Sequence, residues 1–267
     1  MKTRLLIFLC LFGVFTVNAQ IPDSLGLKRN GESETNGHHP EGLKAKVETG
    51  LMVGESKELA GKQYNLNYAH HSFCAALPLA AVGLALMSVD GYVSSSVQTN
   101  MPGFELKFDD YLQYAPWAAH LTMGLCGVKG VSRNRYQIVT ADAFAAIMMA
   151  AVVNGLKYSI NRTRPNGHDA SFPSGHTATA FTGATLLAHE YGDRSIWIPI
   201  AGYTVATATG VMRVLNNRHY VSDVIVGAAV GILAAELAYW ATDAIFKDWK
   251  LFKSHRNMSV DYIIDNY

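Results

Sequence analysis

The sequence predicts an all-α protein, a six-helix bundle embedded in a membrane. Six apolar stretches follow one another from residue 73, and each is 15–19 residues long. Stretches of this length rich in Ala, Leu, Met and Gly are too long for strands and favour helices. They lie near the lower limit for crossing a bilayer, and charged residues make up only 16% of the chain. The six stretches are Phe73–Val89, Tyr111–Val128, Ile138–Leu156, Thr177–Tyr191, Ile196–Met212 and Val224–Ala241.

The N-terminus has the three-part pattern of a secretory signal. Lys2 and Arg4 precede an apolar run over Leu5–Val17, and small residues up to Ala19 fit a cleavage site. We therefore expect residues 1–19 to be a signal peptide.

The rest of the chain divides by composition. Residues 20–72 are polar and predict a loosely ordered mature N-terminal segment. Residues 73–246 hold the six apolar stretches and form the expected main domain, and residues 247–267 form a C-terminal tail.

The charge balance excludes some classes of protein. Lys and Arg number 22 and Asp and Glu 21, so a nucleic-acid partner is not expected. A hydrophobic fraction of 49% excludes a disordered chain, and three cysteines are too few for a disulfide scaffold.

Two loops carry the candidate binding and catalytic residues. One lies between the third and fourth stretches and the other between the fifth and sixth. The fourth helix runs about 22 Å away from the first loop and the fifth runs about 25 Å back, so antiparallel packing brings both loops to one end. The basic residues and histidines collected there are Lys157, Arg164, His176, Arg213, Arg218 and His219.

These cations predict an anion-binding site. The acids of the two loops are Asp169 and Asp223, too few to balance the cations. Arginine forks match phosphate oxygens and lysine adds a point charge, so phosphate is the natural ligand. Ser174 can cap the fourth helix and Gly175 lets its N-terminus approach an anion.

Two histidines complete a catalytic set. His219 and Asp223 are four residues apart and share a face if the segment is helical. Asp223 can then accept the Nδ1 proton of His219 and leave Nε2 free to attack. His176 is free to act as a general acid on the leaving oxygen.

These motifs resemble a known family. The segments Lys157–Pro165, Pro173–His176 and Arg213–Asp223 look like the three-part signature of the type 2 phosphatidic acid phosphatase (PAP2) superfamily. That superfamily includes membrane lipid phosphatases, soluble bacterial acid phosphatases and vanadium haloperoxidases. The resemblance covers roughly residues 73–246. One departure is Met212, where the family often has Ser.

The resemblance implies roles for single residues. His219 would be the nucleophile that forms a phosphohistidine, Asp223 would orient it, and His176 would protonate the leaving group. It implies no metal and no cofactor. The residues that would hold the phosphoryl oxygens are Lys157, Arg164, Ser174, Gly175 and Arg213. Three further polar loop residues are candidates for reading the substrate: His168, Asn217 and Arg218.

The leading hypothesis is a lipid phosphatase of the bacterial inner membrane whose site faces the periplasm. Its partners would be the membrane and a phosphorylated lipid such as lipid A, undecaprenyl diphosphate or phosphatidate. The acidic loop 90–110 indicates the outside and the basic loop 129–136 the inside. A signal peptide followed by six spans would put the motif loops in the cytoplasm. Phe73–Val89, which contains Pro78, is the stretch suspected not to span.

Three alternatives remain open from the sequence. A soluble periplasmic acid phosphatase acting on small phosphomonoesters would explain the signal and the modest mean hydropathy of +0.10. A haloperoxidase using vanadate would use the same pocket. A membrane scaffold that binds an anion without turnover is the alternative outside enzymes.

Overall fold

The computed structural model describes residues 74–132 and 134–264, and all regular structure within them is helical. The all-α prediction is therefore confirmed for these residues. The expected signal peptide 1–19 and polar segment 20–72 lie outside them.

The described helices follow the apolar stretches with some changes of boundary. In chain order they are a helix over residues 74–85, η1 (Leu86–Ser88), α3 (Asp90–Asn100), α4 (Asp109–Leu112), α5 (Ala115–Leu125), α6 (Arg135–Ile160), α7 (Gly175–Tyr191), η2 (Gly192–Arg194), α8 (Trp197–Leu215) and α9 (Val221–Ile264).

The polar stretch after the first apolar segment is helical, contrary to the prediction of a loop. The axis bends by 72° between Cys74–Ser88 and Asp90–Asn100. In α3 the side chains of Thr99 and Asn100 bond the carbonyls of Ser95 and Ser96, at 2.8 and 2.6 Å. Such local bonds satisfy polar side chains within the helix, which composition alone does not reveal.

The second predicted helix is divided in two. α4 ends at Leu112 and α5 begins at Ala115, with Pro116 in its first turn. Proline is favoured there because the backbone N–H groups of the first turn have no carbonyl partner within the helix, so the N–H that proline lacks is not missed. The division places α4, with two aspartates, beside α8 and α7.

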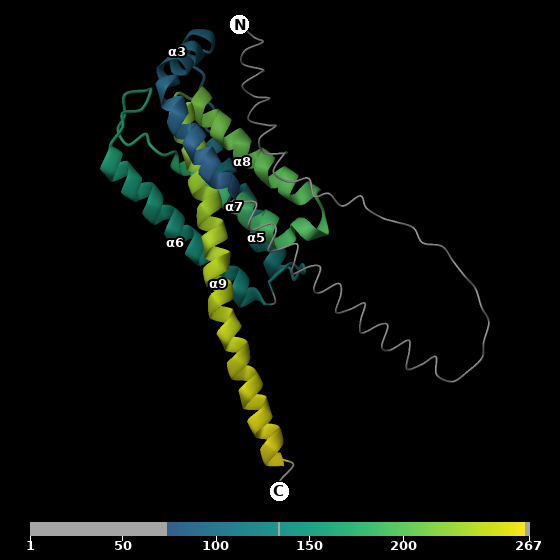
Figure 1. Ribbon diagram of the computed structural model, residues 1–267. Coiled ribbons are helices and arrows are strands. Elements are labelled where there is room, and N and C mark those ends of the chain that lie inside the picture. Colours follow the sequence, from purple (N-terminus) through teal and green to yellow (C-terminus); the bar gives the residue numbers. More distant parts are fainter. Residues whose placement is uncertain (1–73, 133, 265–267) are drawn as a thin grey trace, which may run out of the picture. The chain divides into compact units, whose positions relative to one another are not determined.

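The last helix is longer than predicted. α9 continues without a break from Val221 to Ile264, so most of the tail assigned to 247–267 is one helix with the domain. No Gly or Pro occurs between residues 232 and 264 to stop it. Its last part runs on past the other helices (Figure 1).

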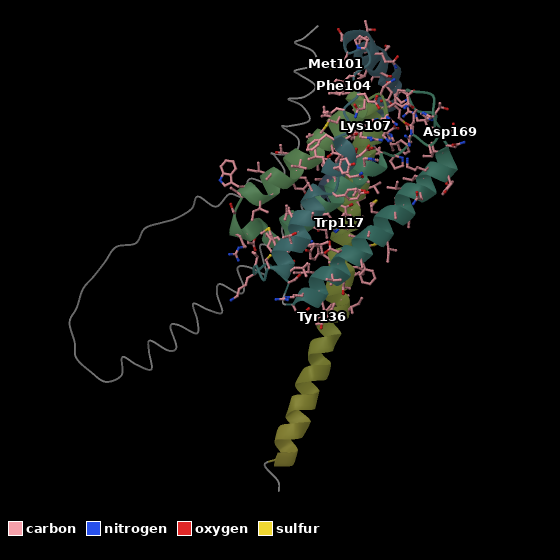
Figure 2. All side chains as sticks on the ribbon, turned by 180° about the vertical axis from the view of Figure 1, so that it is seen from behind. Met101, Phe104, Lys107, Trp117, Tyr136 and Asp169 are labelled. Carbon is pink, nitrogen blue, oxygen red and sulfur yellow. The ribbon has the colours of Figure 1, made fainter. Side chains whose placement is uncertain are left out.

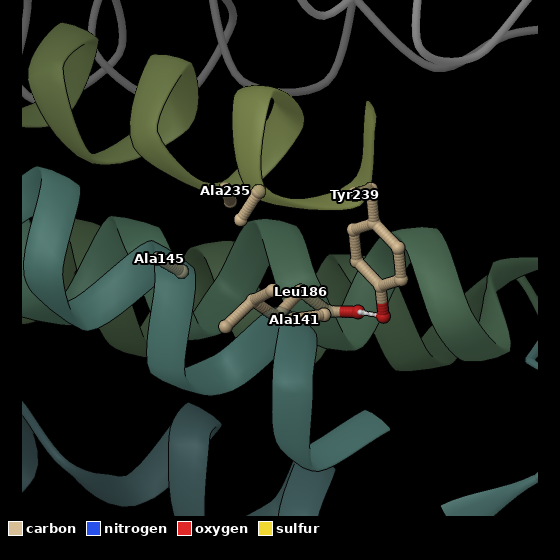
Figure 3. Packing of buried hydrophobic residues seen from close by; sticks show 6 residues of the cluster. Ala141, Ala145, Leu186, Ala235 and Tyr239 are labelled. Atoms are coloured by element: carbon tan, nitrogen blue, oxygen red, sulfur yellow. Dashed lines mark hydrogen bonds between the residues drawn. The ribbon is translucent and has the colours of Figure 1, made fainter. Parts of the chain in front are cut away.

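α7 lies at the centre of the bundle and packs against α9, α8 and α5. A cluster of small and large apolar side chains joins it to its neighbours (Figure 3). Leu186 of α7 packs there with Ala141 of α6 and Tyr239 of α9, whose hydroxyl donates to the Leu186 carbonyl at 3.5 Å.

α7 and α9 approach closely because glycine stands at two positions one turn apart on α9. A Cβ at Gly227 would lie 2.6 Å from the Ser174 carbonyl oxygen, and one at Gly231 would lie closer still to the Ala178 carbonyl oxygen. Small residues four apart allow helix backbones to meet in this way, as at helix interfaces in membranes. This contact fixes the start of α7 against α9.

Three of the described helices are long and apolar enough to cross a membrane: α6, α8 and α9 over Val221–Phe246. A fourth span results if the bent pair Cys74–Ser88 and Asp90–Asn100 counts as one. α5 and α7, with 11 and 17 residues, do not pass this test. Among the described residues these apolar helices indicate a membrane protein, and the bend falls at the end of the stretch Phe73–Val89 that the sequence analysis suspected of not spanning.

Candidate active site

The two predicted loops meet at one end of the bundle, as expected. The first connects α6 to α7 and the second connects α8 to α9. The backbone N–H of Ser174 donates to the carbonyl of Asp223 at 2.9 Å and ties them together. Figure 2 shows Asp169 of the first loop at the same end as Lys107, with Tyr136 at the opposite end.

His219 is buried beside Asp223. Its Nδ1 lies 3.5 Å from Asp223 Oδ2, and only 2% of the residue is exposed. Burial lowers the pKa of His219 to about 4, although the Asp223 carboxylate opposes this shift. The imidazole is therefore neutral at neutral pH. Asp223 lies on its Nδ1 side, but the two atoms are too far apart for the predicted hydrogen bond.

Asp223 is held by several donors. The Ser171 hydroxyl donates to its Oδ2, and the Tyr220 N–H donates to the same oxygen at 2.9 Å. Arg162 Nη1 donates to Oδ1 at 3.1 Å. A carboxylate with this many donors stays ionised and fixed in place, as an orienting group for a histidine must.

Arg162 is a site residue that the sequence interpretation missed. Its Nη2 donates to Asp90 Oδ2 at 2.8 Å, and its guanidinium carbon lies 4.1 Å from the centre of the Tyr220 ring. Asp90 also accepts from the Ser222 N–H at 3.1 Å. Arg162 thereby links the start of α3 to the start of α9. Its position two residues before Arg164 was the available signal.

The predicted phosphate ligands lie close together. Lys157 Nζ donates to the Ala170 carbonyl at 2.7 Å, and Arg164 Nη2 reaches the same oxygen at 3.5 Å. Ala170 has a φ of +57°, a conformation that costs an ordinary residue free energy and is often found at functional sites. Burial and the charge of Arg213 lower the pKa of Arg164.

Two guanidinium nitrogens in this cluster have no partner among the described residues. They are Nε of Arg164 and Nε of Arg213, both buried. A buried donor left unpaired is costly, and binding of an anion would supply its acceptor. Arg213 itself is only 5% exposed.

The start of α7 has the predicted cap. Ser174 Oγ accepts from the Thr177 N–H at 3.4 Å and from the Thr177 hydroxyl at 2.9 Å. A Cβ at Gly175 would meet only Val153, at an ordinary 3.7 Å. Packing among the described residues therefore does not require glycine at 175.

His176 contacts a carboxylate that the sequence interpretation did not place here. Its Nε2 lies 2.9 Å from Asp110 Oδ1. The same oxygen accepts from Arg213 Nη1 at 3.2 Å, and Asp109 Oδ2 accepts from that nitrogen at 2.9 Å. Burial and Arg213 lower the pKa of His176, while Asp110 opposes the shift.

The expectation that Asp169 and Asp223 are the only balancing acids is therefore wrong. α4 brings Asp109 and Asp110 into the cation cluster, whereas Asp169 is exposed. Asp110 is half exposed and Asp109 fully buried. Nothing in the sequence pairs these acids with Arg213, more than 100 residues away, because only the tertiary packing of α4 on α8 brings them together.

The described residues contain no group of three or more His, Cys, Asp or Glu side chains arranged to hold a metal ion.

Residues 139–247 match the family model of the PAP2 superfamily. The chain carries a PAP2 superfamily domain. The match contains both loops of the candidate site and agrees with the resemblance inferred from the three motifs.

Two curated relatives illustrate the similarity. The chain is 45% identical over 186 residues to a lipid A 1-phosphatase of Porphyromonas gingivalis, covering 69% of this chain and 42% of that protein. It is 30% identical over 120 residues to the bacitracin transport permease protein BcrC of Bacillus licheniformis, covering 41% and 57%. The chain thus spans about half the length of these curated relatives.

A solved structure, the transmembrane PAP2-type phosphatidylglycerolphosphate phosphatase of Bacillus subtilis, aligns with 67% of this chain and 96% of its own. The sequence identity is 19% and the TM-score 0.46, so the family assignment rests on the sequence matches.

Proposed function

We propose that this PAP2 protein is a phosphatase that hydrolyses a phosphate ester of a membrane lipid through a phosphohistidine on His219, without a metal ion. The observation that carries the proposal is the buried, neutral His219 beside Asp223, at the same end of an apolar helix bundle as the cation cluster.

In the first step, the phosphoryl group lies among Lys157, Arg164 and Arg213. Nε2 of His219 attacks phosphorus, and the bond between phosphorus and the lipid oxygen breaks. Protonated His176 gives its proton to that oxygen, which leaves as an alcohol. Asp223 stabilises the positive charge that develops on the His219 ring.

In the second step, a water molecule attacks the phosphohistidine. Neutral His176 accepts a proton from the water, and the bond between phosphorus and nitrogen breaks. Inorganic phosphate leaves, His219 is again neutral, and His176 is again protonated. The arginines and Lys157 stabilise the charge on the phosphoryl oxygens in both steps.

The side chain of Asp110 must move away from His176 and Arg213 before a phosphoryl group can bind. Its Oδ1 holds both the proposed acid, His176, and a proposed phosphate ligand, Arg213. A phosphoryl oxygen in contact with these two groups would occupy the position of this carboxylate oxygen. Because Asp110 is half exposed, a change of its side-chain rotamer is enough to clear the site.

A lipid is the proposed substrate class because the helices that carry the site are apolar enough to span a membrane. The P. gingivalis relative is named a lipid A 1-phosphatase, which makes lipid A the leading candidate. Undecaprenyl diphosphate and phosphatidate remain within the same class.

The site is proposed to face the periplasm. At the far end of the bundle, the start of α6 carries Arg135, and Arg194 donates to the Lys129 carbonyl at 2.7 Å. Basic residues at membrane-proximal loops favour the cytoplasmic side, so the opposite end, with His219, would lie outside.

Fractionation combined with a phosphate-release assay tests the proposal. Membrane and soluble periplasmic fractions are each offered a small phosphomonoester and a set of phospholipids including lipid A, with His219→Ala as control. We expect activity in detergent-extracted membranes, with preference for lipids, and none in the variant. Activity on small esters in the soluble periplasm would overturn the lipid assignment.

A further inference from the structure

α3 buries two of its residues, Val97 and Asp90. Val97 is apolar, whereas Asp90 is the one acidic residue of this helix, is 2% exposed and is not used by the mechanism above. Burying a carboxylate costs free energy unless it is paired and hydrogen-bonded. The contacts of Asp90 therefore indicate what α3 does for the site.

Both carboxylate oxygens of Asp90 are bound by residues that adjoin Asp223. Oδ1 accepts from the Ser222 N–H at 3.1 Å. Oδ2 accepts from the Ser222 hydroxyl, and also from Arg162 Nη2 at 2.8 Å. Arg162 Nη1 donates to the Ser222 hydroxyl at 2.8 Å and to Asp223 Oδ1 at 3.1 Å. Arg162 thus bridges the two carboxylates, with one terminal nitrogen on each.

This bridge is largely shielded from water. The side chains of Asp90 and Asp223 are 1% and 0% exposed, and that of Arg162 is 22% exposed. The guanidinium carbon of Arg162 also lies 4.1 Å from the centre of the Tyr220 ring. Charges at such low exposure act on one another with less screening than charges at the surface. The sum of the charges in the bridge therefore matters for the neighbouring His219.

The charge of Asp90 changes that sum. Arg162 and Asp223 alone would be neutral together, and Asp90 makes the group of three negative. Asp223 Oδ2 lies 3.5 Å from His219 Nδ1, so this negative charge adjoins the proposed nucleophile. The His219 ring becomes positive when its Nε2 attacks phosphorus, and a negative neighbour stabilises that charge. Without Asp90, Arg162 would offset the charge of Asp223.

Other cations near His219 make this contribution necessary. Arg213 and Arg164 lower the pKa of His219, and Asp223 opposes them. Both arginines are proposed to hold the phosphoryl group, but they also disfavour a positive charge on the nucleophile. Asp90 offsets Arg162 without entering the phosphate site, because it contacts the terminal nitrogen that does not touch Asp223.

We propose that Asp90 is a positioning residue of the phosphatase reaction, which pairs with Arg162 and so leaves the charge of Asp223 available to stabilise the cation that forms on His219. The proposal rests on the function proposed above. It adds a residue of α3 to the site, outside residues 139–247 that match the family model.

The test uses the purified full-length protein in detergent micelles, with lipid A and phosphatidic acid as substrates. Asp90→Asn keeps the shape of the side chain and removes its charge. The matched control is Asp142→Asn, since Asp142 is also a buried aspartate and accepts from Trp117 Nε1. It precedes Lys157 on α6 by about 22 Å along the helix axis.

We expect Asp90→Asn to lower kcat and kcat/KM equally, by about tenfold, with KM unchanged. This is the scale of loss when a group that orients the partner of a functional histidine is removed, and equal losses mark an interaction made in the transition state. Asp142→Asn should keep kcat within about twofold of wild type, a change within the scatter of independent sites.

The pH profile separates this role from a structural one. With Asp90 uncharged, His219 is harder to protonate, so the acid limb of kcat/KM should move to lower pH. A loosened site would do the opposite, because water around His219 would raise its pKa from about 4 toward 6.5. The position of the limb does not depend on the fraction of folded enzyme.

A double variant tests the route through Arg162. Asp90→Asn should change kcat by less than about twofold when Arg162→Gln is already present, because the charge that Asp90 offsets is then gone. The acid limb of Asp90→Asn alone decides the proposal where Arg162→Gln yields no folded protein.

Two results would overturn the role of Asp90 and leave the phosphatase intact. One is an unchanged kcat in Asp90→Asn, and the other is an acid limb that stays in place or moves to higher pH. Absence of phosphate release from both lipids by the wild type would instead refute the lipid phosphatase function itself.

Discussion

Asp110 and His176 share a hydrogen bond in the candidate site, with Oδ1 and Nε2 2.9 Å apart. The same carboxylate oxygen lies 3.2 Å from Arg213 Nη1. An oxygen of this protein thus already occupies a position between the proposed acid and a proposed phosphate ligand. The substrate must compete with it, and this competition can be measured.

Replacing Asp110 with Asn should strengthen inhibition by inorganic phosphate. A half-exposed ion pair contributes only about 0.2–1 kcal/mol, so the inhibition constant should fall by up to about fivefold. Asp193→Asn, an exposed aspartate in η2 at the far end of the bundle, is the matched control. A higher inhibition constant in Asp110→Asn would show that the carboxylate supports anion binding instead.

The dependence of kcat/KM on pH should be bell-shaped with an acidic optimum. His219 must be neutral, and burial lowers its pKa to about 4, so activity should be lost as pH falls through about 4. His176 must be protonated, and its pKa is lowered from 6.5, so activity should also fall as pH rises toward neutrality.

A pH titration with a soluble phosphomonoester checks this profile in wild type and in Asp110→Asn. Asp110 raises the pKa of His176, so its loss should move the alkaline limb to lower pH and leave the acid limb in place. A rate that is flat from about pH 4 to 9 would contradict the two-histidine scheme.

Arg162 should be needed for stability as well as for the position of Asp223. Its removal leaves the carboxylates of Asp90 and Asp223, 2% and 0% exposed, without their cation. Breaking a buried pair from one side costs about 3–5 kcal/mol. Arg162→Ala should therefore lower the Tm measured by tryptophan fluorescence in detergent.

Arg194→Ala is the control for Arg162→Ala, because Arg194 is exposed and donates to a backbone carbonyl. It should change stability by no more than about 0.5 kcal/mol. Equal Tm values for the two variants would show that Arg162 does not hold the two carboxylates in place.

The contact between α7 and α9 should be sensitive to a single methyl group. Gly231→Ala places a Cβ against the Ala178 carbonyl oxygen and should destabilise the fold by about 1–3 kcal/mol. Gly155→Ala in α6 meets nothing within 4 Å and should be neutral or stabilising. Equal thermal unfolding of both variants would contradict the close approach of the two helices.

Helices and site loops were predictable from the sequence for different reasons. The apolar stretches predicted helices because their length and composition leave no alternative. The site loops were predictable because Lys157, Arg164 and His176 lie close together in the sequence, as do Arg213, His219 and Asp223. Local spacing was enough to place these residues in two loops at one end of the bundle.

The parts that were missed depend on contacts between distant segments. α3 has the composition of a loop, and the bonds of Thr99 and Asn100 to its own backbone do not appear in an apolar pattern. Asp90 is hydrogen-bonded to Arg162, which lies 72 positions later in the chain, and Asp110 is hydrogen-bonded to His176, 66 positions later. Only the folded bundle brings these carboxylates to the site.

The most direct test of the account is to trap the phosphorylated enzyme. Purified protein in detergent is mixed with a lipid carrying labelled phosphate and stopped within milliseconds, and the labelled residue is located by mass spectrometry. The account predicts an acid-labile, base-stable label on His219, absent in His219→Asn. A label on another residue, or full turnover by His219→Asn, would contradict it.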